Sequence, residues 1–169
     1  MYLFSLPAGW AGLSITSRGV YGLTLPAASR GDALRGLERS TGEVDDDDLF
    51  HRVAAELAAY FAGVRVGLAL PVDLDGYSDF QQRVLQELAA IPWGSTRTYG
   101  EVAAAMGNPR AARAVGQACG ANRIPLVIPC HRVTAAGGRL GGFGGGLDWK
   151  RRLLALEGAH YSDREEGKV

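Results

Sequence analysis

The sequence predicts an α+β protein in two parts: a small N-terminal antiparallel sheet with one helix, then a mainly helical C-terminal part. Short alternating runs with turn glycines predict the sheet, and two capping boxes with a helix-turn-helix pattern predict the helical part. The 169 residues suffice for one ordinary domain or two small ones. We place the boundary near Gly76, giving an N-terminal domain of residues 1–76 and a C-terminal domain of residues 77–169.

The N-terminal part begins with residues 1–26, where apolar alternation and turn glycines predict short antiparallel strands. Residues 27–48 are polar and end in four aspartates, which predict a solvated loop leading into a helix, because acids favour a helix N-terminus. Residues 49–62 have apolar positions at helical spacing. Residues 63–77 contain Gly, Pro and Asp and predict a linker.

Two capping boxes predict the first helices of the C-terminal part, since a Ser or Thr is followed three residues later by Gln or Glu. These are Ser78 with Gln81, before a helix that ends near Ala90, and Thr98 with Glu101, before a helix over Tyr99–Met106.

A second short helix follows the second capping box. Gly107-Asn108-Pro109 predicts a tight turn with Asn at the N-cap, and a helix from about Arg110 to Cys119 follows. Two short helices joined in this way form a helix-turn-helix pattern. Small residues, Ala112 among them, leave the second helix smooth, with Arg110 and Arg113 projecting from it. A smooth helix suits close packing on a neighbouring helix or close approach to nucleic acid.

The net charge is zero but unevenly spread. Residues 81–152 hold ten basic against three acidic side chains. This favours a polyanionic partner, with a scattered solvated surface as the alternative. No apolar run approaches a bilayer span of about 20 residues, and the N-terminus lacks the pattern of a signal peptide. We therefore expect a cytoplasmic protein with no membrane partner.

The candidate reactive residues lie together in the segment IPLVIPCHRV, residues 124–133. The apolar run predicts a buried strand that ends at Pro129 and delivers Cys130, His131 and Arg132. A lone cysteine is usually a small buried hydrophobe, but positive neighbours favour a reactive thiolate. With only two cysteines, Cys119 and Cys130, the chain has neither a disulfide framework nor a cysteine-rich zinc site.

Glu157 lies in the last turn of a predicted helix, where the helix dipole disfavours a carboxylate. A cationic partner would offset this, and His131 is the obvious candidate. Glu157, His131 and Cys130 would then form a relay in which the acid orients the imidazole and the imidazole takes the thiol proton. The glycine-rich residues 137–146 predict a lid with Phe143 at its tip, and Asp148 is the predicted cap of the last helix.

Three motifs, GNPRAARAVGQACGAN, PCHRV and GGFGGGLDWKRRLLALEG, resemble the O6-alkylguanine-DNA alkyltransferase family in order and spacing across about residues 78–158. Residues 1–76 resemble the family's variable N-terminal domain only loosely. The resemblance implies an RNase H-like N-terminal domain and a winged-helix-like C-terminal domain. It also implies transfer of an alkyl group from O6-alkylguanine, with O4-alkylthymine as a second candidate, to a cysteine that is consumed once.

The resemblance also implies a role for each matching residue. Cys130 would accept the alkyl group, His131 and Glu157 would activate it, and Asn122 would hold the turn that bears it. Family members often have tyrosine at Phe143 and some have serine at Gly144. The remaining expected residues are Arg113 as the side chain that fills the gap left by the flipped base, Tyr99 at the 3′ phosphate, Arg110, Ala112 and Arg132 on DNA, and Val133, Trp93, Phe143, Gly144 and Gly145 at the pocket or lid.

The expected partner is double-stranded DNA that contains alkylated guanine, bound in the minor groove with the target base flipped out. We expect a monomer that needs no cofactor and, because the ligand residues of zinc-bearing relatives are missing, no metal. Three alternatives remain: a non-catalytic alkyltransferase-like damage-binding protein, a winged-helix DNA-binding regulator, and a cysteine hydrolase built on Cys130, His131 and Glu157.

Overall fold

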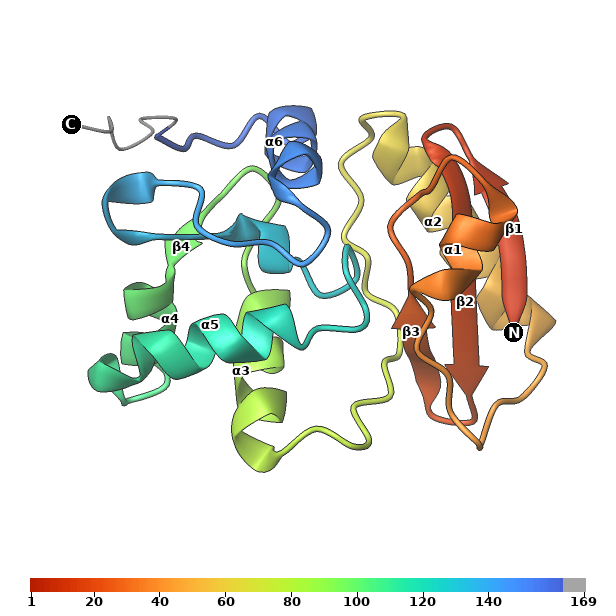
Figure 1. The fold of residues 1–169 in the computed structure, drawn as a ribbon, viewed down its shortest axis with the longest axis horizontal. Coiled ribbons are helices and arrows are strands. Elements are labelled where there is room, and N and C mark those ends of the chain that lie inside the picture. Colours follow the sequence, from red (N-terminus) through yellow and green to blue (C-terminus); the bar gives the residue numbers. More distant parts are fainter. Residues whose placement is uncertain (163–169) are drawn as a thin grey trace. The chain divides into compact units, whose positions relative to one another are not determined.

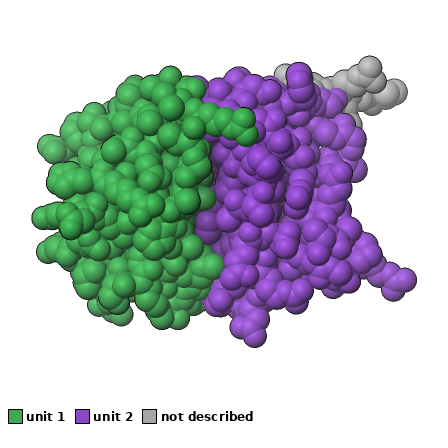
Figure 2. Space-filling view, turned by 180° about the vertical axis from the view of Figure 1, so that it is seen from behind, with its two compact units in different colours: residues 1–76, 123–127 green, residues 77–122, 128–169 purple. Residues whose placement is uncertain are grey.

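The computed structural model describes residues 1–162, and these form two compact units (Figure 2). The first unit comprises residues 1–76 together with residues 123–127, and the second comprises residues 77–122 and the chain from residue 128 onward. The elements of the first unit are β1 (Tyr2–Leu6), β2 (Gly9–Thr16), β3 (Gly19–Leu23), α1 (Arg30–Arg35) and α2 (Asp47–Phe61) (Figure 1). Those of the second are α3 (Asp79–Ala89), β4 (Arg97–Thr98), α4 (Tyr99–Ala105), η1 (Pro109–Ala111), α5 (Ala112–Gly120), η2 (Cys130–Arg132), β5 (Val133–Thr134), η3 (Ala136–Gly138) and α6 (Leu147–Leu156).

The first unit is built on a three-stranded antiparallel sheet in the order β1-β2-β3, as the sequence predicts. Figure 1 shows α1 in front of this sheet and α2 behind it. Leu13 and Ile15 of β2 are fully buried, and α2 contributes Val53 and Leu57 to the buried side chains. This sandwich of a small sheet and helices gives the unit its own core.

Two details of the first unit differ from the prediction. Helix α1 lies inside the segment predicted as a loop; Ser29 caps it by accepting a hydrogen bond from the Asp32 backbone N–H. Helix α2 begins at Asp47, within the aspartate run, and Asp46 caps it through the Leu49 N–H. The run therefore starts the helix and does not only precede it, because aspartate both accepts from free N–H groups and favours the helix dipole.

The helices of the second unit follow their predicted caps. Both capping boxes are formed, at Ser78 with Gln81 and at Thr98 with Glu101. Helix α4, the turn and α5 make the helix-turn-helix, but the second helix opens with the 3₁₀ turn η1 and becomes α-helical only at Ala112. Strand β4 pairs in parallel with β5, which places the segment after η2 beside the start of α4.

Two sequence predictions about the segments around the cysteine are wrong. Residues 124–129 form no strand: Leu126 has a φ of 73°, so the chain turns there while its apolar side chains stay buried. Asp148 does not cap α6, which starts at Leu147 after Gly146 and has no side-chain cap. Gly146 takes the N-cap position with a φ of 88°, a conformation that suits glycine.

Among residues 1–162, no helix combines the length and the apolar character that crossing a bilayer requires.

Candidate active site

Cys130 opens η2 directly after Pro129, and its side chain is buried at the edge of a cavity of about 260 Å³. The cavity lies within the second unit, between helix α5 and the glycine-rich segment. Its lining residues are Tyr99, Gly116, Cys119, Gly120, Cys130, Gly142, Phe143 and Gly144. A thiol at the wall of a cavity is placed to react with a ligand that enters it.

Asn122 holds the thiol directly. Its side-chain amide donates to the Ile128 carbonyl oxygen at 2.8 Å and to the Cys130 Sγ at 3.1 Å. Burial raises the pKa of the Cys130 thiol, while the Asn122 hydrogen bond and the positive charge of Lys150 act in the opposite direction. The thiolate that the sequence suggested from its two cationic neighbours is therefore not the resting form, because desolvation dominates.

The Glu157 carboxylate binds His131, as the sequence predicts. His131 Nε2 lies 2.7 Å from Glu157 Oε1, and both side chains are almost fully buried. Burial lowers the pKa of His131 despite the adjacent carboxylate. The imidazole is therefore neutral at rest, with its Nε2–H donating to Glu157, and the acid fixes its tautomer and orientation.

Glu157 also binds Arg132, which the sequence did not predict. Arg132 donates through Nε to Oε2 at 2.8 Å and through Nη2 to Oε1 at 2.9 Å, and its Nη1 donates to the Ile91 carbonyl at 2.6 Å. The predicted contact of Arg132 with DNA is therefore wrong, because its guanidinium is buried in these bonds. Its charge instead compensates the carboxylate that orients His131.

Gly94 completes the shell around Glu157. Its backbone N–H donates to Glu157 Oε2 at 3.3 Å, and its φ of 76° lies in the region that glycine favours. A Cβ at this position would lie 3.0 Å from the Glu157 carbonyl oxygen. The turn between α3 and β4 can therefore approach the end of α6 only because residue 94 has no side chain.

Lys150 is the main site residue that sequence reasoning missed. Its side chain is fully buried, and Nζ donates to the Val133 carbonyl at 2.6 Å and to the Gly142 carbonyl at 3.1 Å. Burial lowers its pKa to about 8. A lysine in an amphipathic helix is normally expected to be solvated. The sequence signal for its burial is its position on the apolar face of α6, one turn before Leu153 and Leu154.

Tyr99 forms the opposite wall of the cavity and holds the glycine-rich segment. Its hydroxyl donates to the Gly142 carbonyl at 3.3 Å, and burial raises its pKa to about 12. Gly141 has a φ of 66°, and a Cβ there would lie 3.1 Å from the Tyr99 ring. Lys150 and Tyr99 thus bind the same carbonyl, which fixes the segment that carries Phe143.

The predicted pocket residues separate into two groups. Phe143 and Gly144 line the cavity, whereas its lining within the described chain does not include Val133, Trp93 or Gly145. Val133 is fully buried, and its carbonyl oxygen accepts a hydrogen bond from Lys150.

Cys119 shares the cavity with Cys130, which the sequence did not suggest. Burial raises the pKa of the Cys119 thiol to about 12. Cys130 alone has the Asn122 amide on its sulfur, so the two thiols differ in how well they can be ionised.

The second helix of the helix-turn-helix, with the η1 turn before it, presents two arginines to solvent. Arg110 and Arg113 are exposed, and Ala112 between them is half-buried. Val115 and Ala118 face inward, so α5 is anchored on one side and smooth on the other. Within residues 1–162, no three His, Cys, Asp or Glu side chains are grouped as a metal site would require.

Comparison with known proteins connects these features to one family. The family model described as "6-O-methylguanine DNA methyltransferase, DNA binding domain" matches residues 79–159. The methylated-DNA–protein-cysteine methyltransferase of Mycolicibacterium paratuberculosis is 51% identical over 120 residues, which cover 71% of this chain and 72% of that protein. That of Methanosarcina acetivorans is 45% identical over 116 residues, covering 69% and 74%.

Solved structures agree with this match. The crystal structure of Mycobacterium tuberculosis OGT in complex with DNA has a TM-score of 0.75 at 41% identity and covers 92% of this chain and 91% of that chain. The O6-methylguanine-DNA methyltransferase of Pyrococcus kodakaraensis has a TM-score of 0.63 at 25% identity, with coverage of 94% and 98%. The mixed fold of a small antiparallel sheet and helices is therefore that of these proteins.

Proposed function

Because the chain belongs to the 6-O-methylguanine DNA methyltransferase family, we propose that Cys130 takes an alkyl group directly from O6-alkylguanine in double-stranded DNA. The activity is direct-reversal DNA repair by alkyl transfer to a cysteine, that of a methylated-DNA–protein-cysteine methyltransferase. One observation supports Cys130 as the acceptor: its sulfur lines the cavity beside α5 and receives the Asn122 amide at 3.1 Å.

The transfer is a displacement at the alkyl carbon. The Cys130 thiolate attacks that carbon, a carbon–sulfur bond forms, and the carbon–oxygen bond breaks with its electron pair leaving on guanine, which then takes up a proton. Before the attack the thiol proton passes to His131. Since Nε2 of His131 is held by Glu157, the accepting nitrogen is Nδ1, reached directly or through a water.

The product is a thioether, which has no good leaving group. In this scheme the other thiol of the cavity, Cys119, does not remove the alkyl group, because burial raises its pKa to about 12, so each molecule accepts one alkyl group. O4-alkylthymine would present the same reacting carbon and is a second candidate substrate.

Binding to DNA is assigned to the helix-turn-helix. Arg110 in η1 and Ala112 at the start of α5 approach the minor groove, and Arg113 fills the gap left by the flipped nucleotide. Tyr99 stands at the 3′ phosphate and at the cavity wall at once. The basic residues between positions 81 and 152 other than the buried Arg132 and Lys150 supply phosphate affinity without sequence preference.

The assignment extends to the two domains predicted from the sequence. We take residues 1–76 as an RNase H-like domain and residues 77–169 as a winged-helix-like domain that carries both DNA binding and transfer. The protein acts as a monomer in this scheme.

The test is an incubation with duplex DNA that contains one O6-methylguanine, followed by intact mass and peptide mapping. We expect one added methyl group per molecule, on Cys130. Cys130→Ser abolishes transfer while DNA binding stays near wild type. Cys119→Ser is the matched control, since it removes the other thiol of the same cavity and leaves transfer intact. Methylation of Cys119, or transfer by Cys130→Ser above about 1% of wild type, contradicts the assignment.

The same experiment separates the alternatives. A damage-binding protein or a winged-helix regulator binds DNA without gaining mass. A cysteine hydrolase turns over small esters repeatedly, whereas the proposed reaction repairs no more than one guanine per protein molecule.

A further inference from the structure

Residues 123–127 belong to the first unit although the chain on both sides belongs to the second (Figure 2). The chain leaves the second unit after Asn122 and returns at Ile128. The Asn122 amide donates to the Ile128 carbonyl at 2.8 Å, so a hydrogen bond joins the two residues at which this loop begins and ends. Asn122 is therefore fixed from one side by the second unit and from the other by whatever holds residue 123.

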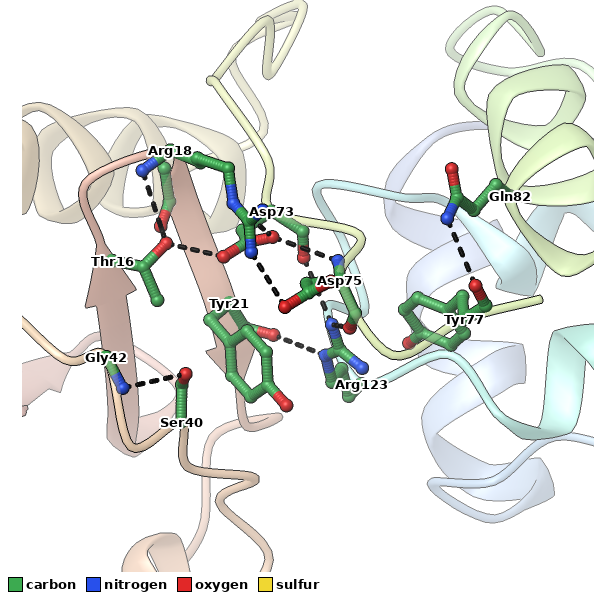
Figure 3. Close-up of polar contacts among 11 residues, drawn as sticks. Thr16, Arg18, Tyr21, Ser40, Gly42, Asp73, Asp75, Tyr77, Gln82 and Arg123 are labelled. Carbon is green, nitrogen blue, oxygen red and sulfur yellow. Dashed lines mark hydrogen bonds and ion pairs between the residues drawn. The ribbon is translucent and has the colours of Figure 1, made fainter. Parts of the chain in front are cut away.

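Both the backbone and the side chain of Arg123 are bonded to residues of the first unit (Figure 3). Its backbone carbonyl accepts from the Leu23 N–H at 2.9 Å. Its Nε donates to the Tyr21 carbonyl at 2.9 Å, and its Nη2 donates to the carbonyls of Asp73, at 3.2 Å, and Asp75. The guanidinium carbon lies 3.9 Å from the centroid of the Tyr21 ring. A planar cation stacked on a ring and bonded at its edge has little freedom to move.

The acceptors of Arg123 are themselves fixed. The buried Asp73 carboxylate accepts from Thr16 Oγ1 at 2.6 Å, from the Asp75 N–H at 2.9 Å, and pairs with Arg18 Nε at 3.2 Å (Figure 3). The backbone at residues 73–75 is thus set by side-chain bonds of its own. Arg123 is anchored to a rigid frame.

We propose that Arg123 is a positioning residue for alkyl transfer: its anchorage in the first unit fixes the backbone from which Asn122 donates to the Cys130 sulfur. The inference rests on the proposed role of Cys130. One side-chain amide serves two acceptors, the Ile128 carbonyl and the sulfur, so a small rotation of residue 122 breaks at least one bond. Arg123 thereby contributes to reactivity through Asn122.

The experiment measures the pH dependence of Cys130 alkylation by iodoacetamide, with peptide mapping to separate Cys130 from Cys119. This probe reports thiol ionisation and needs no DNA. Lys150, Cys119 and Tyr99 also act electrostatically on this site, and all three remain in every variant. The variants are Arg123→Ala, Asn122→Ala, their combination, and Arg30→Ala as the matched control, because Arg30 also stacks on an aromatic ring of the first unit, that of Trp10 at 4.5 Å.

We expect Arg123→Ala to raise the apparent pKa of Cys130 by about one unit and to slow alkylation at pH 7 about tenfold, since a hydrogen bond to the thiolate is lost. Asn122→Ala gives the same shift, the combination gives no further shift, and Arg30→Ala matches wild type. Should Arg123→Ala fail to melt cooperatively, Tyr21→Leu removes only the stacking ring and gives a smaller shift in the same direction.

A folded Arg123→Ala protein with the wild-type pH profile overturns the proposal. So does a combined variant whose shift in the Cys130 pKa equals the sum of the two single shifts. A merely structural role lowers the melting temperature and leaves the profile unchanged. Wild-type protein that gains no alkyl group from DNA contradicts the proposed function instead, and the iodoacetamide profile still decides the role of Arg123.

Discussion

Replacing Glu157 by glutamine tests the buried cluster at the end of α6. The carboxylate receives hydrogen bonds from His131, twice from Arg132 and from the Gly94 N–H. An amide whose oxygen stays at the Oε1 position turns its NH₂ group toward the Nε–H of Arg132 and the N–H of Gly94. The new NH₂ group, itself a donor, then faces two N–H donors in place of the oxygen that accepted from both. The Arg132 guanidinium also loses its counter-charge.

The expected cost is large because the side chains of Glu157 and His131 are almost fully buried and that of Arg132 is only 9% exposed. Breaking a buried ion pair by removing one partner costs about 3–5 kcal/mol. At roughly 2–4 °C per kcal/mol for a chain of this size, Glu157→Gln should melt about 6–20 °C below wild type. Glu87→Gln is the control: Glu87 pairs with Arg97 at 3.7 Å on the surface, where an ion pair contributes about 0–1 kcal/mol.

Thermal melts followed by circular dichroism measure the loss, and the rate with free O6-benzylguanine, taken well below the melting temperature, measures the chemistry. Adding Arg132→Met to Glu157→Gln should recover part of the stability by removing the unpaired charge. It should not recover the rate, because His131 still lacks its orienting acid. A single variant that melts within 2 °C of wild type would refute the reading of Glu157 as the shared counter-ion of His131 and Arg132.

Four further predictions follow from the same geometry. Since burial lowers the pKa of His131, the unfolded chain takes up a proton first, and stability should fall as pH drops below about 6.5; a urea midpoint that is equal at pH 7.5 and 5.5 contradicts this. Lys150→Met should raise the apparent pKa of Cys130 and slow its alkylation by iodoacetamide at pH 7, because a positive charge that favours thiolate is removed; an unchanged pH profile excludes this. Gly116→Ala should stabilise α5 by about 1 kcal/mol yet slow transfer from O6-benzylguanine, because the new Cβ lies 3.8 Å from the Tyr99 ring at the cavity wall; melting and rate are measured on the same protein, and a faster reaction counts against it. Arg113→Ala should slow repair of duplex DNA much more than reaction with free O6-benzylguanine, and equal losses remove its role in base flipping.

The local signals in this sequence predicted elements well. The capping boxes at Ser78 and Thr98 located the starts of α3 and α4, because each is decided by residues three apart. The failures lie where tertiary contacts override local preference. Residues 124–129 are as apolar as a strand, yet Leu126 turns the chain, and only the packing of residues 123–127 with the first unit accounts for it.

The candidate site was predictable in its motif and less so in its electrostatics. The contact between His131 and Glu157 followed from a carboxylate placed against its helix dipole. The roles of Arg132 and Lys150 could not be predicted, since an arginine and a lysine within the basic residues 81–152 first suggest phosphate contacts. Which cation points inward depends on carbonyls from distant segments, here those of Ile91, Val133 and Gly142.

Four of the eight residues around the cavity are glycines. At Gly120, Gly142 and Gly144, an added Cβ would meet no protein atom within 4 Å, so a side chain there would displace no neighbour. At these glycines a substitution can leave the cavity as it is or narrow it, whereas truncating Tyr99 or Phe143 would widen it. Narrower and broader acceptance of alkyl groups are therefore controlled by different residues of the cavity wall. A library built at the glycines should yield narrower specificities in abundance and broader ones rarely.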